Sequence, residues 1–166
     1  LRYLLEALPQ VLSFRPGLTL LIVGEFWNDR AEYDELINKL QIGNSIKIVD
    51  HYVANEVVPL YFSAADAVVL PYLSSTESGI IQLAYGLNTP IITTAVGGNV
   101  DLIEDRKTGV LCMPQNSEDL AKAVIDFYRS NLSRGIKDAM KDNADLFKWT
   151  EAKERVVLDL KPGQEI

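Results

Sequence analysis

The length and composition of the chain are those of a single globular domain. Its 166 residues, 48% of them hydrophobic and 23% charged, are enough to bury a core without disulfides or metal, which argues against a disordered chain. The formal net charge of -7, with no cluster of Lys and Arg, argues against a nucleic-acid-binding surface, and the single cysteine, Cys112, excludes a disulfide framework.

Helical and strand-like patterns alternate from the start of the chain. It opens in the helical pattern LRYLLEALPQVL, and apolar runs then recur at LTLLIV (18–23), IKIV (46–49), AVVLP (67–71), PIITT (90–94) and GVLCM (109–113). These runs are continuous in Val, Ile and Leu, which is typical of strands covered on both faces. No run reaches the ~18 apolar residues that a membrane helix requires.

Helices are predicted between the strand-like runs. Glu32, Leu36 and Leu40 lie around one helix, residues 55–66 form a second with Asn55 as N-cap, and residues 78–88 form a third. Strands that alternate with helices predict a parallel sheet with right-handed crossovers. The predicted fold class is therefore α/β, with a parallel sheet sandwiched by helices.

After the last strand the pattern is wholly helical. Helices are predicted over 117–130, with Ser117 as N-cap, over 131–147 and over 149–160, before a polar tail at 161–166. No internal repeat or linker interrupts the pattern. A single domain is therefore expected over residues 1–160.

The polar segment SSTESG (74–79) lies between a predicted strand and a predicted helix. Ligands of open α/β sheets bind outside the carboxyl ends of the strands, and helix N-termini favour anions. The segment therefore predicts a phosphate site, in which Gly79 would let the phosphate approach the backbone closely. The same residues are also typical of a helix cap that binds nothing, and Glu77 is equally a first-turn carboxylate or an acceptor for ligand hydroxyls. The pattern alone leaves both interpretations open.

An ordered set of motifs extends over most of the chain. It consists of Ala65-Asp66, Pro71, Pro90-Ile91-Ile92, Gly97-Gly98, Gly109, Pro114 and Leu120-Ala121. In order and spacing this set resembles the carboxyl-terminal half of retaining GT-B glycosyltransferases of family 4. Upstream, LTLLIVGE and HYVANEVVPLYFSAAD are similar to two further family segments. The resemblance covers about residues 1–130.

The resemblance implies a Rossmann-like, donor-binding domain. In the family this half binds a nucleotide-diphosphate sugar, here a UDP- or GDP-sugar, and transfers the sugar with retention and without a metal ion. The Arg and Lys that neutralise the leaving diphosphate, and the amino-terminal half that holds a glycan or lipid-linked acceptor, precede this region in the family. We therefore expect the chain to be part of a longer enzyme and to show no turnover alone.

The resemblance also assigns a cellular role. Such enzymes serve polysaccharide biosynthesis in the cytoplasm, in some cases peripheral at the membrane through the amino-terminal half. A lone cysteine likewise makes a reducing compartment the default. A cytoplasmic protein is therefore expected.

Individual residues take roles from the resemblance. Glu77 is expected to reach the hydroxyls of the donor sugar, as the catalytic residue. The diphosphate is expected on Ser75, Thr76, Ser78, Gly79 and the amide of Ile80. Gly24 and Glu25 are expected to line the nucleotide site, and Tyr52 and Val53 to lie where the base rests. Gly97 and Gly98 are expected to form a tight turn rather than a ligand contact.

Two positions depart from the family pattern. The family has two glutamates here, one for the donor sugar and one for the ribose, and their positions fall on Ser75 and Leu83, neither of which is acidic. The segment TESGIIQLAY is closer to a subgroup that reads Thr-Gln-Ser-Gly-Val-x-Gln-x-Ala-Tyr, with Glu77 in place of Gln. The ribose role is therefore not assigned to Leu83.

Two alternatives remain open beside the transferase. A non-catalytic ligand-binding or receiver-like α/β module would need an acidic pair after the first strand and a Lys late in the sheet, and PIITTAVGG has no Lys. A GT-B-type nucleotide-sugar epimerase would need a set of catalytic carboxylates and histidines, and His51 is the only histidine. The transferase interpretation is preferred because it explains the order of all the motifs.

Overall fold

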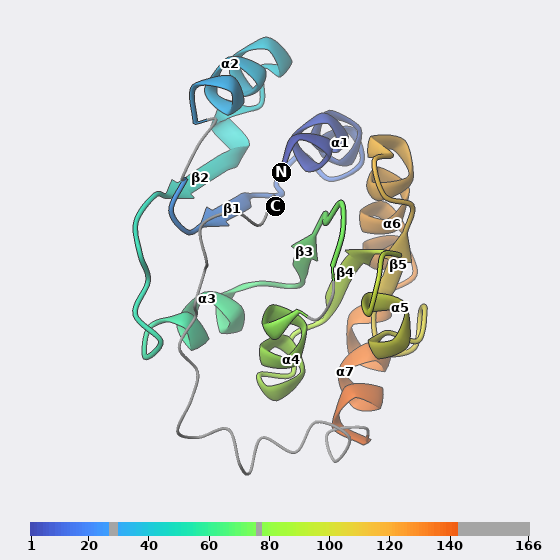
Figure 1. Ribbon diagram of the computed structural model, residues 1–166. Coiled ribbons are helices and arrows are strands. Elements are labelled where there is room, and N and C mark those ends of the chain that lie inside the picture. The colour runs from blue at the N-terminus through green and yellow to red at the C-terminus, as the bar shows by residue number, and fades with distance from the viewer. Residues whose placement is uncertain (27–29, 76–77, 143–166) are drawn as a thin grey trace.

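The computed structural model of the protein describes residues 1–26, 30–75 and 78–142 (Figure 1). In chain order its elements are α1 (Arg2–Phe14), β1 (Leu20–Val23), α2 (Arg30–Leu40), the 3-10 turn η1 (Gly43–Ser45), β2 (Ile46–Val49), α3 (Val58–Ala64), β3 (Val68–Leu70), α4 (Gly79–Gly86), β4 (Ile91–Thr94), α5 (Asn99–Leu102), β5 (Val110–Cys112), α6 (Ser117–Arg129) and α7 (Leu132–Asp142). Each predicted strand is confirmed within its run. The predicted helix over 149–160, the end of the one over 131–147 and the tail at 161–166 lie outside the described residues.

The strands form two parallel ladders. β1 pairs with β2 in the register Leu20 to Ile46, and β4 lies between β3 and β5, with Ile92 opposite both Val69 and Val110. The parallel direction that the βαβ pattern predicts is confirmed. The division into two ladders was not predicted. In the described part of the chain, no ladder hydrogen bonds pair β1 with β3.

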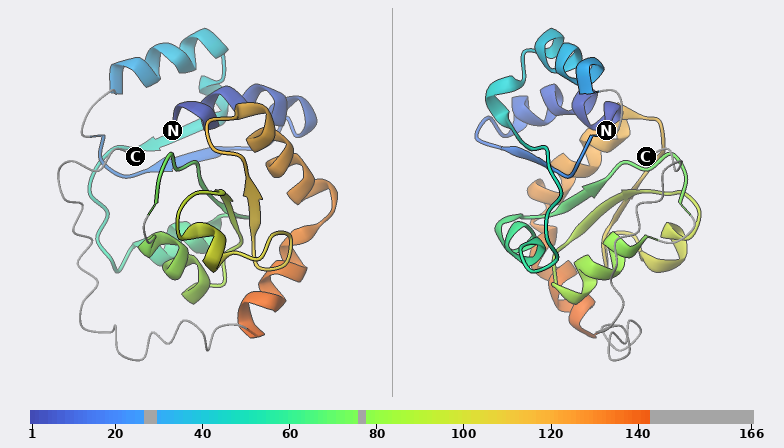
Figure 2. Two further views of the ribbon diagram at one scale, coloured as in Figure 1. Left: turned by 45° about the vertical axis from the view of Figure 1, so that its right-hand side comes forward. Right: turned by 60° about the vertical axis from the view of Figure 1, so that its left-hand side comes forward.

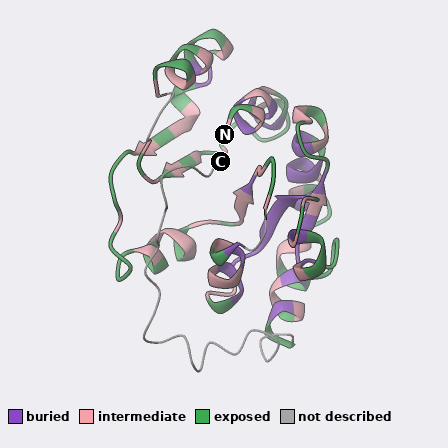
Figure 3. Ribbon diagram, viewed as in Figure 1, coloured by how far each residue is buried: buried purple, intermediate pink, exposed green. Residues whose placement is uncertain are grey.

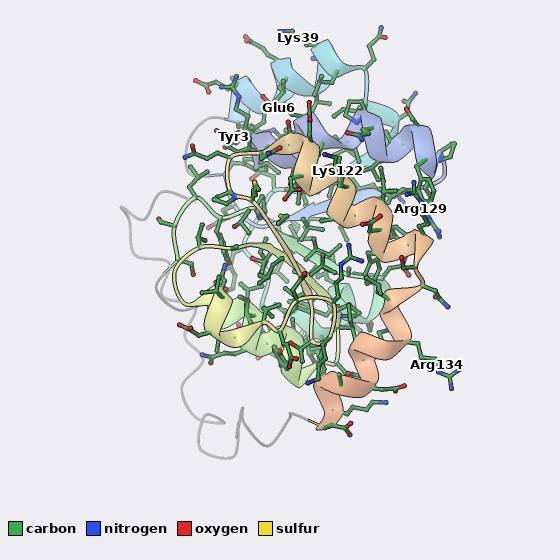
Figure 4. All side chains as sticks on the ribbon, turned by 90° about the vertical axis from the view of Figure 1, so that its right-hand side faces the viewer. Tyr3, Glu6, Lys39, Lys122, Arg129 and Arg134 are labelled. Carbon is green, nitrogen blue, oxygen red and sulfur yellow. The ribbon has the colours of Figure 1, made fainter. Side chains whose placement is uncertain are left out.

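Helices cover the β3–β5 ladder on both sides. In Figure 2, α4 and α5 lie on one side of it, and α1 and α6 lie on the other. Figure 4 views the molecule from the side of α1 and α6 and shows Glu6, Lys122 and Arg129 on their outer surface. The Arg129 guanidinium lies 5.3 Å from the centroid of the Phe14 ring and so joins the ends of the two helices.

The hydrophobic core is concentrated around β4, α1 and α6. All four residues of β4 are buried, and Leu5 of α1 and Phe127 of α6 are at most 1% exposed (Figure 3). Fully burying such a side chain stabilises the fold by about 1.5–3 kcal/mol. The core therefore surrounds the β3–β5 ladder, with buried residues of α4 on the side opposite to α1 and α6.

The β1–β2 ladder is covered less completely. Leu20 and Ile22 pack against the core, whereas Leu21 and Val23 each remain 38% exposed. The prediction that every apolar run is covered on both faces is therefore confirmed for β4 and wrong for β1. Successive side chains of a strand point to opposite faces, so a ladder covered on one side leaves every second residue of β1 near solvent.

Two predicted helix caps are displaced. α3 begins with Val57 as N-cap instead of Asn55, because Pro59 fits the first helical turn, where its missing N–H costs nothing. α6 begins with Asn116 instead of Ser117, and the Asn116 side chain accepts a hydrogen bond from the Asp119 N–H at 2.9 Å. Asn and Ser are both good caps, so adjacent candidates cannot be separated by residue type alone.

Candidate functional site

The sequence-predicted site residues fall into two groups in space. Gly24, Glu25, Tyr52 and Val53 follow the strands of the β1–β2 ladder, and the remaining described residues, Ser75, Ser78, Gly79 and Ile80, follow β3 and begin α4. Within the described part of the chain no hydrogen bond joins the two groups. Thr76 and Glu77 lie outside the described residues, so the roles assigned to them stay predictions.

The end of β1 is fastened to the end of β2. The Gly24 N–H donates to the Val49 carbonyl at 3.1 Å, and the Phe26 N–H donates to Asp50 Oδ1 at 3.1 Å. Gly24 has φ +134°, a conformation that favours glycine, and a Cβ at this position would have no atom within 4 Å. The backbone where the chain leaves β1 is therefore open to an approaching group.

Asp50 and Arg30 complete this corner of the molecule. Arg30 Nη1 lies 2.8 Å from Asp50 Oδ2, and its guanidinium lies 5.0 Å from the centroid of the Phe26 ring. The sequence pattern indicated neither residue, although an acid directly after the run IKIV was a usable signal. Because Asp50 accepts a hydrogen bond from the Phe26 N–H and is ion-paired with Arg30, it fixes the path of the chain after β1.

The segment after β2 presents an aromatic ring to solvent. Tyr52 is 59% exposed and Val53 is half-buried. A free aromatic face beside an apolar side chain suits stacking with a planar group. His51, directly before them, is also exposed.

The start of α4 is built around the buried hydroxyl of Ser78. This N-cap residue is 5% exposed, its Oγ accepts a hydrogen bond from the Ile81 N–H at 3.4 Å, and the same oxygen lies 3.1 Å from the Tyr72 hydroxyl. Burial raises the pKa of the Tyr72 phenol, so it stays a neutral hydrogen-bonding group. Ser78 therefore serves first as a helix cap, which is the interpretation that the sequence left open.

The first turn of α4 offers unused donors. Gly79 is exposed, a Cβ there would have no atom within 4 Å, and the N–H groups of Gly79 and Ile80 have no hydrogen-bond partner among the described residues. Such N–H groups carry the positive end of the helix dipole and attract anions. This turn can therefore offer backbone donors to an anion, whereas the Ser78 hydroxyl is engaged as the helix cap.

A turn at Gly97 packs against the backbone of Ser75. Gly97 has φ +46°, and a Cβ on it would stand 1.6 Å from the carbonyl oxygen of Ser75. Only glycine lets the two backbones approach so closely. The tight turn predicted at Gly97 and Gly98 is confirmed, and it is followed by the short helix α5, which was not predicted.

Buried polar groups at the end of β4 connect these pieces. Thr94 Oγ1 donates to the Tyr72 carbonyl at 2.7 Å, and Thr93 Oγ1 donates to the Leu70 carbonyl at 3.0 Å. Asn99 Nδ2 donates to Thr93 Oγ1 at 3.1 Å and to the Thr94 carbonyl at 3.2 Å. The sequence pattern did not indicate this network, although the two threonines at the end of the otherwise apolar run PIITT were a signal.

Other features of the described chain do not join the site. A hollow of about 180 Å³ between α6 and the turn before β5 is lined by charged residues, among them Asp105, Arg106 and Lys122, and by none of the predicted site residues. Among residues 1–26, 30–75 and 78–142, no group of His, Cys, Asp and Glu side chains is placed to hold a metal ion. None of the helices described has the length and apolar character to cross a membrane.

Comparison with known proteins identifies the family. The family model described as glycosyl transferases group 1 matches residues 1–130. The chain belongs to this family. The match confirms the resemblance to the donor-binding half of GT-B glycosyltransferases that the motifs carry. A comparison with the curated proteins found no match.

Solved structures of glycosyltransferases share the fold. Sucrose-phosphate synthase from Thermosynechococcus elongatus aligns with a TM-score of 0.77 at 26% identity, over 90% of this chain and 39% of that one. HepE from Anabaena, crystallised with UDP, aligns with a TM-score of 0.77 at 21% identity, over 87% of this chain and 40% of that one. The chain thus spans about two fifths of the length of these relatives.

A third structure with the same fold is that of an isolated C-terminal domain. The C-terminal domain of a glycosyl transferase group 1 family protein, LpcC from Francisella tularensis, aligns with a TM-score of 0.76 at 21% identity, over 93% of this chain and 80% of that domain. The predicted α/β, Rossmann-like fold of a carboxyl-terminal GT-B half is therefore confirmed.

Proposed function

We propose that the chain is the donor-binding half of a retaining glycosyltransferase and that it holds a UDP-sugar. The observation that carries the proposal is the first turn of α4, where the N–H groups of Gly79 and Ile80 have no partner among the described residues and stand at the carboxyl end of β3. Family membership and the structures of HepE with UDP and with UDP-glucose support this choice of ligand.

The diphosphate is assigned to the start of α4. Its charge is stabilised by the amides of Gly79 and Ile80 and by the helix dipole, with Ser75 and Thr76 as further donors. Stabilisation of this charge matters for the reaction because the diphosphate leaves as an anion when the sugar is transferred. Ser78 contributes by holding the first turn in place, and Glu77 is assigned to the hydroxyls of the sugar.

The nucleoside is assigned to the ends of β1 and β2. The open backbone at Gly24, with Glu25 beside it, lines the nucleotide site, and the exposed ring of Tyr52 and the side chain of Val53 contact the base. A GDP-sugar is the competing donor. Tyr52 stacks on either base, so the choice between the two bases is a matter for binding experiments.

The remaining functions are assigned to a longer protein. We infer that the amino-terminal half of the enzyme supplies the acceptor site, for a glycan or lipid-linked acceptor of polysaccharide biosynthesis, and that the chain alone shows no turnover. No metal ion takes part in this proposal, because protein charges and helix dipoles neutralise the diphosphate. We also infer that the protein is cytoplasmic and that any contact with the membrane is made by the amino-terminal half.

The proposal is tested by titrating the isotope-labelled chain with UDP, GDP, ADP and UDP-glucose. UDP is expected to shift the amide resonances of Ser75, Ser78 and Ile80 together with those of Tyr52 and Val53, while the amide of Gly135 on α7, which is not among the proposed site residues, does not move. If no nucleotide at millimolar concentration shifts the start of α4, either the Arg and Lys that precede this region in the family carry nearly all of the affinity or the SSTESG segment is only a helix cap. Repeating the titration with the preceding segment restored separates the two explanations. If the start of α4 again does not respond, the chain is better described as a non-catalytic α/β module.

A further inference from the structure

We propose that Tyr72 is a positioning residue that holds the start of α4 through its hydroxyl contact with Ser78. The inference rests on the proposed function, because it assigns to Tyr72 the task of placing the amides that bind the diphosphate. Tyr72 contacts no ligand in this proposal. It acts through Ser78, which begins α4.

The geometry makes Tyr72 a link between three elements. Its backbone directly follows β3 and Pro71, its carbonyl accepts a hydrogen bond from Thr94 Oγ1 of β4 at 2.7 Å, and its hydroxyl lies 3.1 Å from Ser78 Oγ at the start of α4. The Thr94 contact fixes the backbone of Tyr72 to the buried strand β4. The phenol contact then links Tyr72 to Ser78, the N-cap residue of α4.

The loop is held at a further point between these ends. The Ser75 carbonyl lies against the backbone of Gly97, so close that a Cβ on Gly97 would stand 1.6 Å from the oxygen. Thr94 thus holds the backbone of Tyr72, the glycine turn lies against Ser75, and the Tyr72 hydroxyl contacts Ser78. Groups held in this way bind a ligand without losing much further conformational entropy.

The position of Ser78 matters for binding because Ser78 sets the path of the next residues. Its Oγ caps the Ile81 N–H, and its carbonyl accepts hydrogen bonds from the N–H groups of Ile81 and Gln82. The amides of Gly79 and Ile80 therefore point where Ser78 places them. Loss of the phenol contact would leave the cap intact and let the first turn shift relative to β4.

The first test replaces Tyr72 with Phe, which removes only the hydroxyl. The affinity of the folded 166-residue chain for UDP is measured from the amide shift of Ile80, beside Tyr128→Phe as a matched control. Tyr128 also loses one hydroxyl contact, to Asp66 Oδ2 at 3.1 Å, outside the proposed site. Tyr72→Phe is expected to raise the Kd about five-fold, the size of one lost hydrogen bond, and Tyr128→Phe to leave it unchanged.

A double-mutant cycle separates positioning from general loss of stability. If Tyr72 acts through Ser78, the Tyr72→Phe and Ser78→Ala effects on the Kd are not additive, and the double variant binds UDP about as well as Ser78→Ala alone. Additive effects would show that Tyr72 acts by another route. Should Tyr72→Phe fail to fold, the comparison of Ser78→Thr, which keeps the hydroxyl, with Ser78→Ala tests whether the Ser78 hydroxyl, through which Tyr72 would act, affects binding at all: equal affinities overturn the proposal.

The outcomes distinguish the two proposals. If wild-type binds neither UDP nor any other nucleotide tested, with or without the preceding segment restored, the proposed function fails and the positioning role fails with it. If wild-type binds UDP and Tyr72→Phe binds it equally well, the proposed function stands and only the positioning role of Tyr72 is overturned. If Tyr72→Phe and Tyr128→Phe weaken binding equally, the effect is one of stability and the role is again overturned.

Discussion

At the scale of single residues, Gly97 has little freedom to change. In Gly97→Ala the new Cβ would collide with the Ser75 carbonyl, and φ +46° is itself unfavourable for alanine. We expect the free energy of unfolding, measured with urea, to fall by at least about 2 kcal/mol. The matched control is Gly135→Ala in α7, where a Cβ has open space. A helix interior is more stable with alanine than with glycine, so Gly135→Ala is expected to raise the free energy of unfolding by about 0.5–1 kcal/mol. Equal effects of the two changes would contradict the prediction.

The buried thiol of Cys112 gives a pH dependence. Burial raises its pKa from 9.0 to about 12, and the residue is 4% exposed. The folded pKa lies above the unfolded one, so the stabilisation is fully present below pH 9 and is lost as the pH rises towards 12. Above pH 9, the free energy of unfolding is expected to fall more steeply for wild-type than for Cys112→Ala. Parallel pH profiles would show that the thiol ionises equally in both states.

At the scale of elements, the cap of α6 separates two candidates that the sequence could not. Asn116→Ala removes the hydrogen bond from the Asp119 N–H and is expected to cost about 1 kcal/mol of unfolding free energy, measured with urea. Ser117→Ala, at the position predicted from the sequence, lies inside the helix and is expected to change stability by less than about 0.5 kcal/mol. The reverse order of the two effects would place the cap at Ser117.

The elements also show how far the sequence could predict this fold. The strands and the parallel direction follow from local patterns, because the apolar side chains of a run such as PIITT indicate a buried strand. The contact of Tyr72 with Ser78 and that of Thr94 with the Tyr72 carbonyl do not follow, because they depend on the relative placement of segments up to 22 residues apart. The same holds for the site: the N-terminus of α4 was predicted, whereas the burial of Ser78 and its contact with Tyr72 were not.

At the scale of the whole molecule, the two ladders are expected to differ in stability. β4 is buried along its length, whereas β1 leaves Leu21 and Val23 partly exposed, so less apolar contact opposes local opening of the β1–β2 ladder. Native-state hydrogen exchange is therefore expected to be slower at the amide of Ile92 in β4 than at that of Ile22 in β1. Equal rates at both positions would mean that the two ladders open only together, as one cooperative unit.

Ligand binding gives the last prediction at this scale, because the proposed UDP site draws on both ladders. The base is assigned to Tyr52 after β2 and the diphosphate to Ile80 in α4, so one bound molecule would join parts that no ladder hydrogen bond connects in the described chain. Saturating UDP is then expected to slow exchange in β1 and β2 as well as in α4, since any opening that separates the ladders must first release the ligand. Inorganic pyrophosphate is the matched control, because it carries the diphosphate without the nucleoside and is expected to protect α4 alone. Protection confined to α4 with UDP as well would contradict the assignment of the base to Tyr52 and Val53 while leaving the diphosphate site in place.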